Sequence, residues 1–135
     1  MTLEEAKEIK KSLIGFDPED GKECLEIAKW NGWCLAYVKE QTPEICLEVV
    51  KQNGYVLQYV KDQTEEICLA AVKQCPRSLV FVKDQTPEIC LEAVRHHGQA
   101  LQYVKEQTPE ICIEAIKNDN SAIAYVRDLS MIVDE

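Results

Sequence analysis

Cysteine is the residue type of this chain whose number and regular spacing first raise the question of catalysis, cross-linking or metal binding. Five of the seven cysteines recur at a constant 22-residue interval: Cys24, Cys46, Cys68, Cys90 and Cys112. If the interval reflects stacked helical repeats, equivalent residues lie about 9–10 Å apart. A disulfide needs Cα atoms within about 7 Å, and zinc ligands must converge within about 2.3 Å of one ion. The spacing therefore favours small, buried, apolar side chains.

Histidine occurs only as the adjacent pair His96 and His97. Neighbouring residues on a helix point about 100° apart, so the two rings are poorly placed to share one metal ion. No serine or cysteine is placed beside them by spacing, and no Gly-rich phosphate loop, C-x-x-C, H-E-x-x-H or G-x-S-x-G motif occurs. We therefore expect no catalytic residue, no metal and no cofactor, and we predict that the chain is not an enzyme.

The same interval governs the elements that must position these side chains. In the unit TPEICLEVVKQNGYVLQYVKDQ, which spans residues 42–63, Thr42 predicts a helix N-cap and the proline after it the first helical position. This helix should end at an Asn-Gly pair, with Gly54 free to take the left-handed conformation. A second helix is expected from about Tyr55 to Asp62. Each unit is thus predicted to be a short helical hairpin.

The apolar positions of both helices cover about 200° of the helix circumference, so each helix must be covered on more than one side. Stacked hairpins satisfy this requirement. We predict an all-α fold, an α-solenoid of stacked short helical hairpins that forms a single domain over residues 1–135. Its parts are a cap helix (1–19), five 22-residue repeats (20–41, 42–63, 64–85, 86–107 and 108–129) and a truncated sixth unit (130–135). The cap is assigned because Leu13 and Phe16 repeat the spacing of Leu57 and Val60.

Charge and hydropathy exclude several classes of partner. The net charge is −9, whereas nucleic-acid binding needs a dense positive surface. No apolar stretch approaches the roughly 20 residues that cross a bilayer, and the first 14 residues have neither a signal-peptide nor a transit-peptide pattern. Free thiols in this number suit a reducing compartment. We expect a cytoplasmic protein without nucleic-acid or membrane partners.

Comparing the units with one another separates positions with a fixed residue type, which packing requires, from positions where the residue type varies. The aromatic column is fixed, as expected for core positions: Tyr37, Tyr59, Phe81, Tyr103 and Tyr125. The turn between the two helices of each unit varies instead, and it defines a candidate partner-binding edge: Trp30, Trp33, Tyr55, Arg77, His96, His97 and Gln99. Trp, Tyr and Arg are frequent in interface hot spots. The alternative is that the two tryptophans simply pack under the N-terminal helix.

Units 42–63 and 86–107 resemble a family of short, uncharacterised 22-residue helical repeats, found in amoeba-infecting giant viruses and in some bacteria and protists. The shared elements are the Pro-Glu-Ile start, the Ala-Val-Lys or Val-Val-Lys run, Asn-Gly and Leu-Gln-Tyr, and they cover residues 20–128. The resemblance implies an α-solenoid and transfers no catalytic residue. The departures are Pro76 in place of the turn glycine, Glu65 in place of the helix-start proline, and an irregular first unit.

These patterns favour a non-enzymatic protein–protein interaction scaffold, which would display the variable turn edge on a rigid solenoid. The alternative is an acidic inhibitor or immunity-type protein that blocks a single enzyme or a nucleic-acid-binding partner. The partner in either case is a protein. Apolar residues near the C-terminal end also lead us to consider a weak homodimer through that end: Ile123, Tyr125, Met131 and Val133.

Overall fold

The computed structural model describes residues 1–14, 32–38 and 40–133, apart from the side chain of Trp33. Within these ranges every regular element is helical. The α-helices are α1 (Leu3–Ile14), α3 (Pro43–Gln52), α4 (Glu65–Gln74), α5 (Pro87–His96) and α6 (Pro109–Asn118). The 3-10 helices are η1 (Gly32–Tyr37), η2 (Gly54–Tyr59), η3 (Pro76–Phe81), η4 (Gly98–Tyr103), η5 (Asn120–Tyr125) and η6 (Leu129–Met131).

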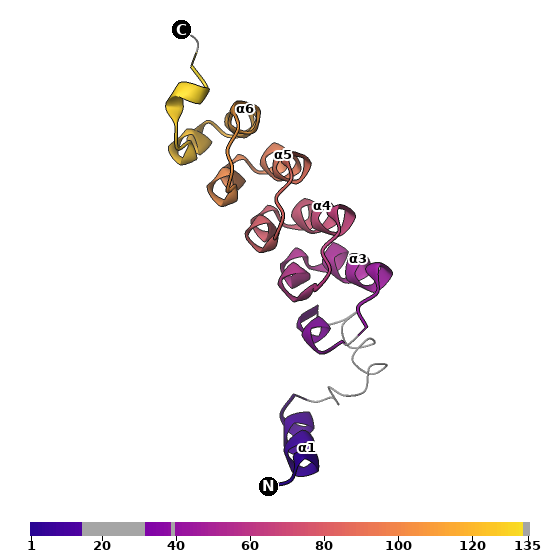
Figure 1. Cartoon of the computed structure of the whole chain (residues 1–135). Helices are drawn as coiled ribbons and strands as arrows, with labels where there is room; N and C mark the ends of the chain where they lie inside the picture. Colours follow the sequence, from indigo (N-terminus) through magenta and orange to yellow (C-terminus); the bar gives the residue numbers. More distant parts are fainter. Residues whose placement is uncertain (15–31, 39, 134–135) are drawn as a thin grey trace.

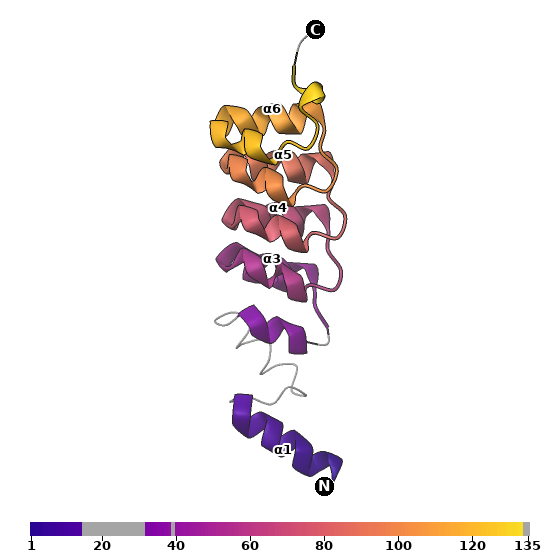
Figure 2. The same cartoon turned by 90° about the vertical axis from the view of Figure 1, so that its left-hand side faces the viewer.

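The units from residue 42 onwards stack in register, and each consists of a ten-residue α-helix followed by a six-residue 3-10 helix. The α-helices form one column and the 3-10 helices a second column beside it (Figure 1). Seen from the 3-10 side, successive units lie nearly parallel to one another (Figure 2). The prediction of an all-α solenoid is therefore confirmed.

A threonine begins every α-helix from α3 to α6, as the sequence predicts for Thr42. The hydroxyl of Thr42 accepts the N–H of Ile45 at 3.3 Å, and the three later units repeat this bond at 3.2–3.3 Å. Thr64 caps α4 although Glu65 follows it in place of proline. The threonine side chain alone is therefore sufficient to fix the start of the helix.

The core follows the fixed columns of the repeat. Four cysteines of the 22-residue column are free thiols at most 3% exposed, which fits their prediction as small buried side chains: Cys46, Cys68, Cys90 and Cys112. Cys24 lies outside the described residues. The aromatic column is only partly buried and packs against the core from outside. These rings therefore take part in core packing, as predicted, but they are less buried than Leu57 and Leu79, which are fully buried.

The second helix of each unit differs from the prediction in type and length. It is a 3-10 helix that ends at Tyr59, not an α-helix that reaches Asp62. An α-helix would need the N–H of Lys61 to bind the carbonyl oxygen of Leu57. That N–H donates instead to Oε1 of Gln41, in the preceding unit, at 2.9 Å. The Gln41 side chain thus binds the N–H of Lys61 that a longer helix would need.

Gly54 does not adopt the predicted left-handed conformation. The residue before it, Asn53, ends α3 in an extended conformation, and Gly54 opens η2. A Cβ atom on Gly54 would collide with the carbonyl oxygen of Ala71 in the next unit and would lie 2.7 Å from Oγ of Ser78. Glycine is required here because two units approach closely, not because the chain reverses direction.

The N-terminal helix α1 does not bury the side chain on which the cap prediction was based. Leu13 is 81% exposed, whereas Leu57, with which the sequence aligned it, is fully buried. No residue of α1 is buried. Leu13 thus does not share the burial of the leucine with which it was aligned, and Phe16 lies outside the described residues. The assignment of residues 1–19 as a cap stays a prediction.

In the described ranges, no helix is both long enough and apolar enough to cross a membrane. Of the apolar residues named near the C-terminal end, Ile123 is 49% and Val133 is 61% exposed, whereas Tyr125 and Met131 are partly buried. Pairing of two copies through this end stays a prediction.

Candidate partner-binding edge

A glutamine at the end of each unit holds the next unit in place. The side chain of Gln63 donates from Nε2 to the carbonyl oxygen of Phe81 at 2.9 Å, and its Oε1 accepts the N–H of Lys83 at 3.0 Å. The same Oε1 accepts the thiol of Cys68 at 3.6 Å. Gln41, Gln85 and Gln107 repeat this arrangement. Sequence analysis missed this role, although the recurrence of a glutamine at the end of every unit was visible.

A second bond between units lies at the turn edge. The N–H of Gly54 donates to Oε1 of Gln74 at 2.6 Å, and the N–H of Gly98 donates to Oδ1 of Asn118 at 2.7 Å. Pro76 occupies the equivalent position in the unit between them and has no N–H to donate. The residue that would accept that bond is His96, whose Nε2 lies 2.9 Å from Oε1 of Glu92 instead. At this interface, therefore, both the N–H donor and the side-chain amide acceptor of the bond are missing.

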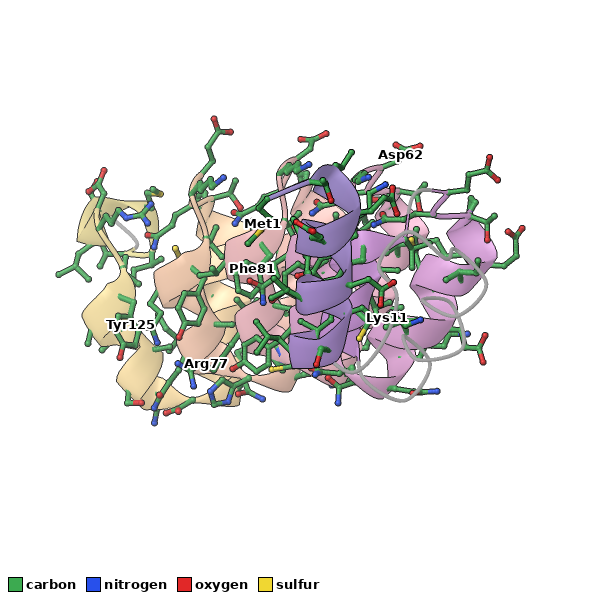
Figure 3. The ribbon with its side chains drawn as sticks, turned by 90° about the horizontal axis from the view of Figure 1, so that it is seen from below. Met1, Lys11, Asp62, Arg77, Phe81 and Tyr125 are labelled. Atoms are coloured by element: carbon green, nitrogen blue, oxygen red, sulfur yellow. The ribbon has the colours of Figure 1, made fainter. Side chains whose placement is uncertain are left out.

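The predicted edge residues form a row along the 3-10 column. Tyr55, Arg77 and Gln99 each take the second position of their 3-10 helix. Tyr55 is 38% exposed, and its ring meets that of Phe81 edge-on, with centroids 6.2 Å apart. Nε of Arg77 donates to the hydroxyl of Tyr103 at 3.3 Å. Figure 3 views the stack from the α1 end and labels Arg77 and Phe81 of η3 on the side of the 3-10 column.

The row becomes more polar towards the C-terminus. Nε2 of Gln99 donates to Oδ2 of Asp119 and to Oγ of Ser121, both at 3.3 Å. Hydrogen bonds from the Ser121 hydroxyl and N–H lower the pKa of Asp119 below its ordinary value. One end of the row therefore offers an aromatic ring and a cation, and the other end offers amide, hydroxyl and carboxylate groups.

The histidines lie beside this row rather than within it. His96 is the last residue of α5, and His97 is the extended residue between α5 and η4. Trp30 lies outside the described residues, and Trp33 belongs to η1 although its side chain is not described. The alternative in which both tryptophans pack under the N-terminal helix stays open.

The thiols are buried in a way that disfavours nucleophilic chemistry. Burial, together with the charges of Asp84 and Glu65, raises the pKa of the Cys68 thiol to about 11, and burial raises the pKa of the Cys90 thiol to about 11. A reactive cysteine needs the opposite shift, because the thiolate is the nucleophile. Across the described ranges, no three His, Cys, Asp or Glu side chains gather as metal ligands would.

In-register helical pairs, joined to their neighbours by repeated side-chain bonds, define a helical repeat protein of the solenoid class. The chain belongs to the family described as a domain of unknown function, DUF4116, whose model matches residues 42–85 and again residues 86–129. Each match spans two of the 22-residue units. No curated protein and no solved structure matches the chain.

Proposed function

We propose that this chain is a non-enzymatic scaffold for protein–protein interaction, which displays the turn edge on a rigid solenoid. The observation that supports this proposal is the row of Tyr55, Arg77 and Gln99. These residues occupy equivalent backbone positions in successive 3-10 helices, yet their side chains differ in chemistry. The glutamine bonds between units use main-chain atoms of the following unit, so the edge can vary without loss of the stack.

Two residues of the row suit a binding surface energetically. The ring of Tyr55 is held by its contact with Phe81, and the guanidinium of Arg77 is held by the hydroxyl of Tyr103. Immobilising a mobile side chain on binding costs about 0.5–1.5 kcal/mol of conformational entropy. Side chains that are already ordered lose less. Tyrosine and arginine are also the types that dominate interface hot spots. The partner is therefore a protein that contacts this edge.

The second candidate, an acidic inhibitor or immunity-type protein, is supported by the net charge of −9. Its weakness is that acidic and basic residues alternate along the exposed loops, as Lys61 and Asp62 do. Binding that weakens steeply with added salt would favour this candidate, because its affinity would depend on charge. The buried free thiols of either candidate suit the reducing cytoplasm.

The test is affinity capture from the source cells with the immobilised chain, followed by titration of the purified partner. The variant Tyr55→Ser with Arg77→Ser removes both anchors, and Glu110→Ser with Lys117→Ser is a matched double variant on α6. We expect the edge variant to weaken binding at least about tenfold and the control to leave it unchanged. A partner that binds both variants as tightly as the wild type would contradict the proposal, and so would the retention of no protein at all.

A further inference from the structure

An open groove lies on the α-helical column, between α3 and α4. It has a volume of about 480 Å³ and is lined only by residues of α3 and α4. Leu47, Leu69 and Ala70 are half-buried and form its apolar part. Lys51 and Lys73 line the groove at one end, and both are exposed. The groove therefore combines an apolar floor with two cations.

The repeat supplies its own comparison for this groove, two units further along the chain. Between α5 and α6, the carboxylate of Glu114 lies 3.7 Å from Nε of Arg95 and 3.6 Å from Nζ of Lys117. Subtracting two repeats from 95, 114 and 117 gives 51, 70 and 73. The groove thus has both cations of the α5–α6 pair, with Ala70 where that pair has a glutamate.

The substitution removes the carboxylate that would neutralise the two lysines. Neither Lys51 nor Lys73 forms an ion pair with another described residue. Alanine is also shorter than glutamate, so the apolar surface of Leu47 and Leu69 remains open beside the charges. An anionic group from outside the chain can take the place that Glu114 takes in the later pair.

We infer that this groove binds a peptide segment of a partner protein that presents a carboxylate side chain next to an apolar side chain. The carboxylate would pair with Lys51 and Lys73, and the apolar side chain would lie on Leu47 and Leu69. Glu66 lines the groove seven residues before Lys73, about 10 Å along α4. It repels a second carboxylate there and so fixes the direction in which the segment lies.

A phosphate-bearing ligand fits this groove less well. The net charge of −9 repels an extended polyanion such as nucleic acid, which needs many cations at once. The apolar floor also contributes nothing to a phosphate, whereas it stabilises a leucine or phenylalanine side chain. The inference is independent of the proposed turn-edge function, because no residue of the row lines the groove.

The experiment selects random dodecapeptides displayed on phage against the whole chain and then measures the enriched peptides by calorimetry. Ala70→Glu restores the carboxylate that the later pair contains, and Lys51→Gln with Lys73→Gln removes the cations. Glu114→Ala changes the same position of a different unit and serves as the matched control. Circular dichroism verifies that each variant is folded.

We expect enriched peptides to carry Asp or Glu beside Leu, Ile or Phe. Their affinity should fall at least about tenfold for both groove variants, and by the same factor when the peptide carboxylate is replaced by its amide, with no loss for Glu114→Ala. Peptides without an acidic residue, equal affinity for Ala70→Glu, or no enrichment would overturn the inference. A wild-type dimer that Ala70→Glu dissociates in sedimentation would also overturn it, because the occupant would then be a second copy of this chain.

Discussion

Replacing Gln85 by alanine tests whether the glutamine bonds hold successive units together. The Gln85 side chain donates to the carbonyl oxygen of Leu79 at 3.1 Å and to that of Tyr103 at 2.9 Å. Its Oε1 accepts the N–H of Lys105 at 2.9 Å. The substitution removes these three bonds and also the weaker one that Oε1 accepts from the Cys90 thiol at 3.8 Å. It leaves the two main-chain groups of the following unit without this partner.

The expected cost follows from counting these bonds. A hydrogen bond between neutral groups contributes about 1 kcal/mol net, so the three bonds amount to about 3 kcal/mol. For a chain of this size, a loss of that magnitude lowers the melting temperature by about 10 °C. The matched control is Gln102→Ala, since Gln102 is exposed and, among the described residues, its side chain donates to the carbonyl oxygen of Gln99 in its own 3-10 helix. We expect the control to change stability by less than about 0.5 kcal/mol.

Chemical denaturation measures the free energy of unfolding, and hydrogen exchange identifies the interface that is weakened. The amide of Lys105 should lose protection in Gln85→Ala, because its acceptor is gone. The amide of Lys61, which donates to Gln41 at a different interface, should retain more protection. If Gln85→Ala costs less than about 1 kcal/mol, or no more than Gln102→Ala, the glutamines do not join the units and the reasoning is refuted.

Three further predictions concern the core and the turn edge. Leu79→Ala should lower the free energy of unfolding by about 2–5 kcal/mol, because Leu79 is fully buried. Gly98→Ala should lower it by about 1–3 kcal/mol, because the added Cβ would collide with the carbonyl oxygen of Ala115 in the next unit. Raising the pH from about 8.5 to about 11 should also reduce stability. Burial raises the pKa of the Cys68 and Cys90 thiols to about 11, so the unfolded chain loses these protons at lower pH than the folded chain.

Denaturation of matched variants checks these three predictions. Val80→Ala is the control for the leucine, since Val80 is its neighbour and is 50% exposed. Asn120→Ala is the control for the glycine, because Asn120 opens η5 at the equivalent position and already has a Cβ. Replacing both thiols by alanine should flatten the pH dependence. Equal costs for a variant and its control, or an unchanged pH dependence without the thiols, would contradict the corresponding prediction.

Sequence alone was sufficient for the features that depend on local chemistry. The cap by Thr42 needs only its own hydroxyl and the N–H of Ile45, three residues away. The burial of Cys68 and Leu79 follows from apolar columns that recur in every unit. These features identified the solenoid and the positions of the α-helices.

Features that depend on the neighbouring unit could not be predicted in the same way. The 3-10 helix ends at Tyr59 because Gln41, 20 residues before Lys61, takes its N–H. Gly54 is needed because the carbonyl oxygen of Ala71 lies close to it, and this contact cannot be predicted from the identity of either residue. The turn edge was found from variation between units. The groove was missed because the absence of a carboxylate at Ala70 becomes apparent only when the equivalent Glu114 is seen to pair with two cations.

The glutamine bonds have a consequence for how such a chain can change in evolution. Gln63 recognises the next unit through a carbonyl oxygen and an N–H, which every non-proline residue at those positions provides. A duplicated, deleted or transplanted segment that is one unit long therefore keeps the glutamine bonds on both sides. The length of the array and the chemistry of its edge can consequently diversify by recombination between units while these bonds are retained.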